Sequence, residues 1–322
     1  MIAAMQSALE PAAREAGEIA HLWWIYLWVL SGVFLIVAVC LFFAICKQNL
    51  RPEGLAMSAA PGRQRYGRAL RIVAAAVVAT VLVLFALLVL DFFTGNAIYA
   101  KPDPNAMAIK VTGHQWWWEI EYKNPQPSEI MTTANEIHVP IGKTVKLELQ
   151  STDVIHSFWV PSMHGRKDLV PGSPSTTWFV ANRGGEFRGQ CAEYCGEQHA
   201  HMRLTFTAET PADFERWLAA QKQSAPEPAN DRQQRGRALF ISSQCMMCHT
   251  IQGTNARAAL GPDLTHIASR SLLAAGEIPN TPENMARWID NPQKIKPGTR
   301  MPANKFSSND LNALVEYLES LK

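Results

Sequence analysis

Two long apolar runs without a charged residue constrain the fold of this chain more than any other feature. They cover residues 22–46 and 72–90, so they are 25 and 19 residues long. A helix needs about 20 apolar residues to cross a bilayer. We therefore expect a hairpin of two transmembrane helices, with spans at about residues 22–46 and 72–91. The alternative, a helical hairpin buried in the core of a soluble protein, fits runs of this length poorly.

The charges beside these runs predict the orientation of the hairpin. The segment between them carries one acidic residue, Glu53, and six basic ones: Lys47, Arg51, Arg63, Arg65, Arg68 and Arg71. By the positive-inside rule this segment faces the cytoplasm, so both termini lie on the other side. The first 21 residues hold three acidic side chains and one basic one, unlike the basic start of a signal peptide. We expect a bacterial inner (cell) membrane protein, in contact with lipid, whose chain after Asp91 is periplasmic.

Beyond the second run the chain changes character twice. Residues 96–210 alternate apolar and polar side chains in short stretches separated by Gly and Pro, which predicts a β sandwich or small barrel. Residues 211–220 are predicted to be helical, with Trp217 on an apolar face. Residues 221–232 are polar, contain two prolines and are typical of a linker. Residues 233–322 show helical patterns at 233–241, 282–289 and 309–321. We expect a multi-domain chain: a tail and hairpin in residues 1–95, a β domain in 96–220 and a small all-α domain in 233–322.

The distribution of charge predicts how the outer domains interact. The net charge is +2, which gives no reason to expect nucleic acid as a partner. Residues 92–232 hold 13 basic and 16 acidic side chains, whereas residues 233–322 hold 10 basic and 7 acidic ones. These opposite net charges favour docking of the helical domain on the β domain.

Four of the six cysteines form two pairs, and the first pair lies in a segment rich in soft ligands. The segment reads Cys191-Ala-Glu193-Tyr-Cys195-Gly-Glu-Gln-His199-Ala-His201-Met202. Thiolates, imidazoles and a thioether select copper over magnesium or calcium, and two cysteines can bridge two copper ions. His156, at the end of an apolar stretch, is the best candidate for a second imidazole. A disulfide between the two cysteines and a structural zinc site are the alternatives, and His201 competes with His199 as a ligand.

This segment resembles the copper-binding loop of cytochrome c oxidase subunit II, Cys-x-Glu-x-Cys-Gly-x-x-His-x-x-Met, with all six positions filled. The likeness extends over about residues 20–210 and includes the aromatic stretch that starts at Gly113. It implies a cupredoxin-like β-barrel that holds a binuclear copper centre, CuA. Its ligands would be Cys191 and Cys195 as bridges, His156, His199, Met202 and the carbonyl group of Glu193.

The same resemblance implies roles for neighbouring residues. The Glu193 side chain would reach a magnesium ion shared with subunit I, and Trp116 would be the entry point for electrons from cytochrome c. For Trp117 and Trp118 we expect core packing. The sequence departs from the family at Ser173, where many members have Arg. It also lacks a carboxylate near the start of the second span, which leaves a role in proton uptake open.

The second pair of cysteines forms the motif Cys245-Met-Met-Cys248-His249. Two thiols at this spacing can form thioethers with haem vinyl groups, and the histidine that follows is an axial ligand. A thioredoxin-like redox pair and half of a zinc site are the alternatives, but neither a βαβ pattern nor another cysteine pair accompanies the motif. Residues 233–322 resemble class I cytochromes c, which implies covalent haem c with Met301 as the sixth ligand.

Together the two resemblances imply the electron-input subunit of a haem–copper terminal oxidase in a respiratory chain. Electrons would pass from cytochrome c or another donor to haem c, to CuA and then to subunit I. There oxygen would be reduced to water with proton translocation, so the oxygen-reducing site of this oxidoreductase lies in another subunit. Partners would be subunit I and subunit III. A CuA-containing nitric oxide reductase and a membrane-tethered copper-delivery module are the alternative functions.

Overall fold

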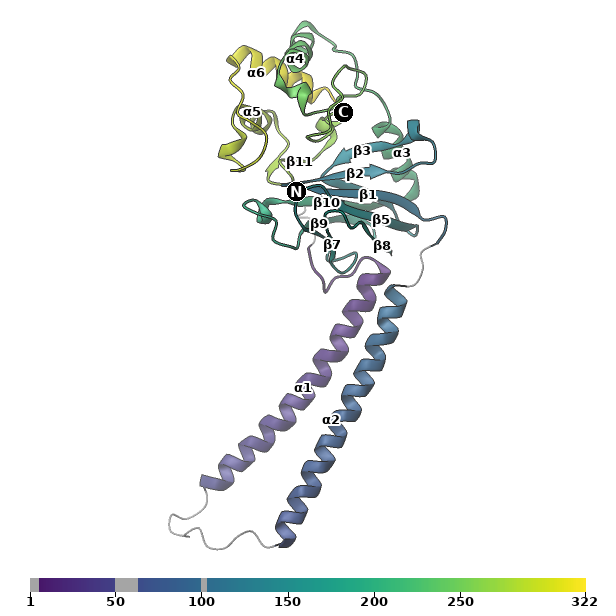
Figure 1. Ribbon diagram of the computed structural model, residues 1–322, viewed down its shortest axis with the longest axis vertical. Helices are drawn as coiled ribbons and strands as arrows, with labels where there is room; N and C mark the ends of the chain where they lie inside the picture. Colours follow the sequence, from purple (N-terminus) through teal and green to yellow (C-terminus); the bar gives the residue numbers. More distant parts are fainter. Residues whose placement is uncertain (1–5, 50–62, 100–102) are drawn as a thin grey trace. The chain divides into compact units, whose positions relative to one another are not determined.

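The computed structural model describes residues 6–49, 63–99 and 103–322 (Figure 1). By its contacts the chain divides into two units. One comprises Gly17–Ala100, and the other comprises Met1–Ala16 together with Lys101–Lys322.

The first unit consists of two long helices. They are α1 (Arg14–Asn49), whose first turn belongs to the other unit, and α2 (Arg63–Ile98). Their most apolar windows have mean hydropathies of 2.9 and 3.1, and only 0% and 6% of those windows are buried. Both helices are long and apolar enough to cross a membrane, and they lack the burial of core helices. The two predicted helices are thus confirmed, and each continues helically into the flanking polar residues.

The structure describes only some of the charged side chains from which the membrane orientation was predicted. Arg51 and Glu53 lie outside the described residues, as do the side chains of Arg63 and Arg65. The cytoplasmic location of this segment therefore stays a prediction.

The second unit begins with a sandwich of two five-stranded sheets, here called the sandwich. Their orders are β3-β2-β1-β5-β8 and β4-β10-β9-β6-β7. The strands are β1 (Met107–His114), β2 (Trp117–Tyr122), β3 (Met131–Ala134), β4 (Glu136–Pro140), β5 (Thr144–Ser151), β6 (His156–Trp159), β7 (Lys167–Leu169), β8 (Ser175–Val180), β9 (Gly185–Cys191) and β10 (Arg203–Glu209). The β1–β5 and β4–β10 pairs are parallel, and the other strand pairs are antiparallel.

Alternating burial along the strands builds the core between the two sheets. Every second residue of β5 and of β10 is buried, as a half-exposed strand requires. Phe179 and Phe206, from different sheets, make an edge-on contact with ring centroids 5.4 Å apart. Trp118 is fully buried in the same core, as expected from the sequence. The predicted β domain is therefore confirmed.

The N-terminal segment is attached to the sandwich. The Ala12 amide donates to the Ser162 carbonyl at 2.7 Å, and Ala13 forms a β-bridge with Ala181. Glu15 is fully buried and accepts a hydrogen bond from the Val180 amide. These contacts fix the chain just before the apolar part of α1.

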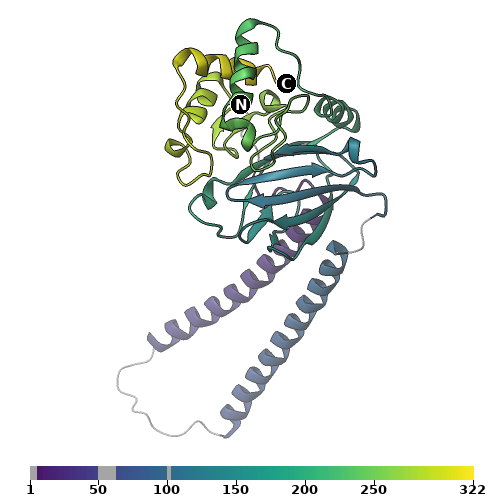
Figure 2. The same cartoon turned by 45° about the horizontal axis from the view of Figure 1, so that its top comes forward.

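The remaining residues form a small helical body, here called the C-terminal body (Figures 1 and 2, green to yellow). Helix α3 (Pro211–Gln221) follows the sandwich, and Lys222–Asn230 connects it to α4. The C-terminal body contains α4 (Asp231–Ser242), α5 (Pro282–Asp290), α6 (Ser308–Glu319) and the short helices η3 (Gln244–Met247), η4 (Ile267–Ser269) and η5 (Pro292–Lys294).

Side-chain caps and one close contact explain the helices of the C-terminal body. Asn230, Thr281 and Ser307 each accept a hydrogen bond from an amide in the first turn of α4, α5 and α6. A Cβ atom at Gly236 would lie 2.1 Å from the Ala313 carbonyl oxygen, so glycine lets α4 and α6 pack closely. The predicted helical domain is confirmed, and a two-residue strand pair, β11 (Leu272–Leu273) and β12 (Ile278–Pro279), adds to it.

Candidate copper and haem sites

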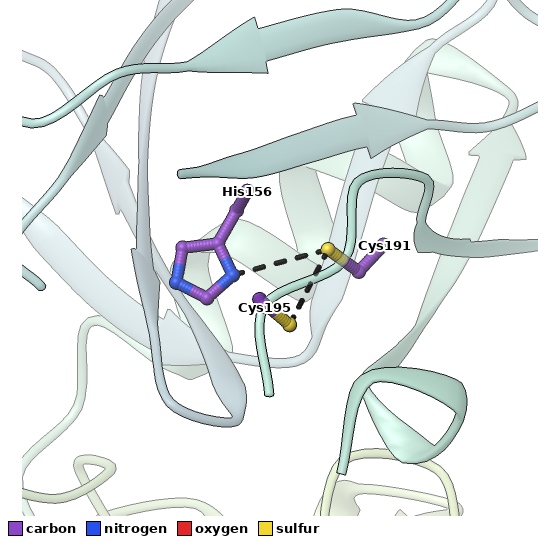
Figure 3. A group of neighbouring side chains, drawn as sticks. All are labelled: His156, Cys191 and Cys195. Atoms are coloured by element: carbon purple, nitrogen blue, oxygen red, sulfur yellow. Dashed lines mark hydrogen bonds between the residues drawn. The ribbon is translucent and has the colours of Figure 1, made fainter. Parts of the chain in front are cut away.

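Three of the predicted copper ligands meet in the sandwich (Figure 3). The ligand atoms of His156, Cys191 and Cys195 all lie within 4.8 Å of one another, and all three residues are buried. Cys191 Sγ is 3.8 Å from His156 Nδ1 and 3.8 Å from Cys195 Sγ. Because a disulfide needs about 2.05 Å between the sulfur atoms, both cysteines are free thiols here.

The other three predicted ligands surround the same pair of thiols. His199 Nδ1 lies 3.7 Å and Met202 Sδ 4.0 Å from Cys195 Sγ. The Glu193 carbonyl oxygen lies 3.2 Å from Cys191 Sγ. Two thiols, two imidazoles, a thioether and a carbonyl therefore converge on one space, and such soft donors fit copper.

The loop between β9 and β10 supplies five of these six groups. Strand β9 ends at Cys191, and the amide of that residue donates to the Met202 carbonyl at 3.0 Å, which closes the loop at its base. Gly196 has a φ of +114° and lies against Trp116, so a side chain there would be both strained and crowded. His156 comes from β6, which is paired with β9.

Asp153 fixes the orientation and tautomer of His156. Its Oδ1 lies 2.8 Å from His156 Nε2, and its carboxylate also accepts from the amides of Gln115 and Val154. Burial raises the pKa of Asp153, but these hydrogen bonds outweigh it and hold that pKa at about 2. The anion therefore keeps the proton on Nε2 and leaves Nδ1, which faces Cys191, free to bind metal.

The two thiols share their protons unequally. The hydrogen bond with Cys195 lowers the pKa of Cys191 to about 3, with further help from His156. The same contact with Cys191 raises the pKa of Cys195. A metal bound by both sulfur atoms would require both thiols to be deprotonated.

Trp116 lies against the loop between β9 and β10. Its indole Nε1 donates to the Cys195 carbonyl at 3.0 Å, and the Gln115 side chain donates to the same oxygen at 2.8 Å. Trp117 instead stacks on His114, with ring centroids 4.4 Å apart. Among Trp116, Trp117 and Trp118, it is therefore Trp116 whose indole donates a hydrogen bond to Cys195.

In the C-terminal body, the ring of His249 is fixed by one hydrogen bond. Its Nδ1 donates to the Pro262 carbonyl at 2.7 Å, which leaves Nε2 free. Burial lowers the pKa of His249, so the ring is neutral. Cys245 and Cys248 lie half-buried in and directly after η3, and the His249 amide donates to the Cys245 carbonyl. The two cysteines and the imidazole of the motif thus lie in one folded segment, with Nε2 of His249 not engaged by Pro262.

Met301 lies in the loop between η5 and α6, and Gln293 shapes that loop. The Gln293 amide group donates to the carbonyls of Thr299 and Met301 and accepts from the Gly298 amide. Its pairing with His249 across a haem stays a prediction. Among the other methionines of the C-terminal body, Met285 is buried in the core and Met247 is 68% exposed. His266 is buried and hydrogen-bonded to the Gln223 carbonyl, so it packs inside the C-terminal body.

Sequence reasoning missed two kinds of supporting residue. Asp153 lies three positions before His156, and a carboxylate so near a candidate ligand is a usable signal. Gly113 and Gly261 make room for the two histidines. A Cβ atom would lie 2.7 Å from His156 Cδ2 at the first position and 2.7 Å from His249 Cε1 at the second. Neither close approach is visible in the sequence.

Comparisons with known proteins cover both the sandwich and the C-terminal body. The family model of the periplasmic domain of cytochrome c oxidase subunit II matches residues 124–208, and that of cytochrome c matches residues 233–322. A protein of Alkalihalophilus pseudofirmus named cytochrome c oxidase subunit 2 is 33% identical, over 98% of this chain and 91% of the relative. This chain belongs to the cytochrome c oxidase subunit 2 family.

Other members are similar over parts of the chain. The cytochrome c oxidase subunit 2 of Bacillus subtilis is 32% identical over 68% of this chain and 63% of its own length. A crystal structure of the periplasmic domain of subunit II from Bradyrhizobium japonicum matches with 31% identity and a TM-score of 0.34, covering 38% of this chain and 95% of that one. The two apolar helices and these relatives fit a membrane-anchored subunit II with periplasmic domains.

Proposed function

We propose that this chain is the electron-input subunit of a haem–copper terminal oxidase. Electrons enter from cytochrome c or another donor, pass through haem c and the CuA pair, and leave for subunit I. The observation that carries this proposal is the presence of two redox-type ligand sets in one subunit II chain. One is the six-donor cluster around Cys191 and Cys195, and the other is the Cys245–His249 motif.

The sandwich supplies the copper ligands. Cys191 and Cys195 are proposed as bridges, with the Nδ1 atoms of His156 and His199 as terminal ligands, and with Met202 and the Glu193 carbonyl as weak ligands. A copper pair bridged by two thiolates takes up and releases single electrons with little change in its bonds. The chain favours this by burying four of the donor residues, His156, Cys191, Cys195 and Met202. It also closes the loop at its base through the Cys191 amide and the Met202 carbonyl. Asp153 holds His156 in the binding tautomer.

The C-terminal body supplies the haem ligands. Cys245 and Cys248 are proposed to form thioethers, with His249 and Met301 as axial ligands. Covalent haem c held by these residues would supply a one-electron centre for an external donor. Methionine ligation raises the haem potential, which suits a donor of high potential.

The remaining partners follow from the role of a subunit II. Oxygen reduction and proton pumping are assigned to the complex, with the oxygen site in subunit I and with subunit III as a further partner. The Glu193 side chain is 40% exposed and near Arg166, and we assign it to a magnesium ion at the subunit I interface. The hairpin is proposed to place both termini and both redox domains on the periplasmic face of the inner membrane.

Stopped-flow reduction of the full chain, loaded with copper and haem c, tests the proposed route. A high-potential donor should reduce the haem first and the copper afterwards. Met301→Leu should lower the haem potential and make entry from this donor unfavourable, whereas Met285→Leu, a volume-conserving change in the same domain, should not. Copper that is reduced at the same rate without passing through the haem would overturn the route and favour direct entry at Trp116.

A further inference from the structure

Lys296, two residues after η5, crosses from the C-terminal body to the sandwich. Its Nζ donates to the carbonyls of Trp116 and His201, both at 2.7 Å, and to that of Ala274 in its own domain at 3.1 Å. An ammonium group has three donors and no acceptor, so all its hydrogen bonds are made. The residue is only 2% exposed, although an unpaired buried ammonium would be costly.

A second contact holds the same two segments together. The Arg203 amide at the start of β10 donates to the Ala275 carbonyl at 3.0 Å. Ala274, Ala275 and Gly276 have φ values of 54°, 60° and 83°, which are unfavourable for the two alanines. Lys296 donates to the Ala274 carbonyl, and the Arg203 amide of the sandwich donates to the Ala275 carbonyl. These two hydrogen bonds hold the turn in this conformation.

The loop that Lys296 begins leads to the predicted haem ligand. Gly298 lies against Glu197 and Trp116, because a Cβ atom there would be 2.7 Å from Glu197 Oε2 and 3.5 Å from Trp116 Cη2. Met301 follows three residues later. Trp116 in turn donates to the carbonyl of Cys195. Lys296 therefore ties the loop with Met301 to the tryptophan that contacts the copper site.

The charges around this contact match the predicted docking. Arg300 Nη2 lies 3.8 Å from Asp153 Oδ2, and Arg270 Nε lies 3.7 Å from Glu136 Oε1. In both pairs an arginine of the C-terminal body lies near a carboxylate of the sandwich. Exposed pairs such as the first contribute little energy, so they steer the domains more than they fix them.

We propose that Lys296 is a positioning residue that fixes one docked orientation of the C-terminal body for electron transfer. In that transfer one electron leaves the haem iron and reaches the copper pair, and no proton moves. The transfer rate falls steeply with distance, so an orientation that keeps the Met301 loop on Trp116 is faster than a freely searching domain. This inference rests on the proposed function.

The test compares Lys296→Met with Lys294→Met in the full chain loaded with copper and haem c. Both variants replace a lysine of the same segment by methionine, but Lys294 is exposed whereas Lys296 is buried. Lys296→Met should slow electron transfer from pre-reduced haem to copper at least tenfold. The remaining rate should depend on solvent viscosity, because the domain must now find its orientation. Lys294→Met should transfer as fast as the wild type. Both haem and copper potentials should stay unchanged, which a distorted site would not allow.

Amide hydrogen exchange gives a readout that does not depend on electron transfer. The Arg203 amide is bonded across the interface, whereas the Thr205 amide donates to Asn135 within the sandwich. In Lys296→Met, protection at Arg203 should fall at least tenfold, and protection at Thr205 should not change.

Two results would overturn the inference. One is unchanged protection at Arg203 in Lys296→Met, and the other is lost protection with an unchanged transfer rate. A wild-type chain whose haem never reduces its copper would instead overturn the proposed function.

Discussion

At the scale of single residues, two glycines decide whether the histidine ligands fit. Gly113 in β1 lies against the His156 ring, and Gly261 lies against the His249 ring. Neither has the positive φ that usually explains a glycine, so the missing side chain itself is what matters. Each glycine brings the backbone close enough to support one face of the imidazole.

Gly113→Ala should therefore displace His156 without unfolding the sandwich. The new Cβ would lie 2.7 Å from Cδ2, and the ring cannot move without leaving Asp153. We expect the copper affinity to fall at least tenfold, which is about the effect of losing a residue that supports a metal ligand. Equilibrium copper titration measures this change, with Lys110→Ala on the same strand as control. An unchanged copper affinity would contradict the prediction, because it would mean that the His156 ring can move without losing its position as a ligand.

Asp153→Asn should weaken copper binding through His156. An amide cannot provide the anion that holds the proton on Nε2, so the Nδ1 tautomer is no longer selected. Loss of such an orienting partner typically costs about 10–100-fold in metal affinity. Glu148→Gln removes an exposed carboxylate from the same domain and should leave the affinity intact. Equal affinities of the two variants in copper titration would contradict this role of Asp153.

At the scale of elements, the sequence names the candidate ligands but not the residues that support them. The spacing from Cys191 to Met202 placed five donors in one loop, and the structure brings His156 to them through β6 and β9. Strand alternation and helix periodicity were visible because they are local. The contacts of Asp153, Gly113 and Lys296 depend on residues far apart in the chain, which no local pattern encodes.

The packing of α4 on α6 offers a test of the C-terminal body. Gly236→Ala would place a Cβ atom 2.1 Å from the Ala313 carbonyl oxygen, so the helices must separate. Overpacking of this kind costs about 1–3 kcal/mol in the free energy of unfolding. Denaturant unfolding followed by haem absorbance measures it. Gln234→Ala, at an exposed position of α4, is the control and should show no loss. Equal midpoints for the two variants would contradict the close packing.

At the scale of the whole molecule, the chain joins two apolar helices, a sandwich with a soft-metal site and a C-terminal body with a haem-binding motif. Composition and two motifs predicted all three parts. The opposite net charges of the two domains predicted that they attract each other. The hydrogen bonds of Lys296 across the interface cannot be predicted from net charge. The membrane orientation is predicted by the positive-inside rule.

The ratio of copper to haem tests the central claim most directly, because both proposed centres enter it. Elemental analysis of the full chain, combined with an assay of covalently bound haem, gives this ratio. The two thiols with their surrounding donors predict two copper ions, and the Cys245–His249 motif predicts one haem. Two coppers and one covalent haem per chain are therefore the expected result. One copper per haem, or tightly held zinc without copper, would contradict the binuclear centre and the electron route built on it.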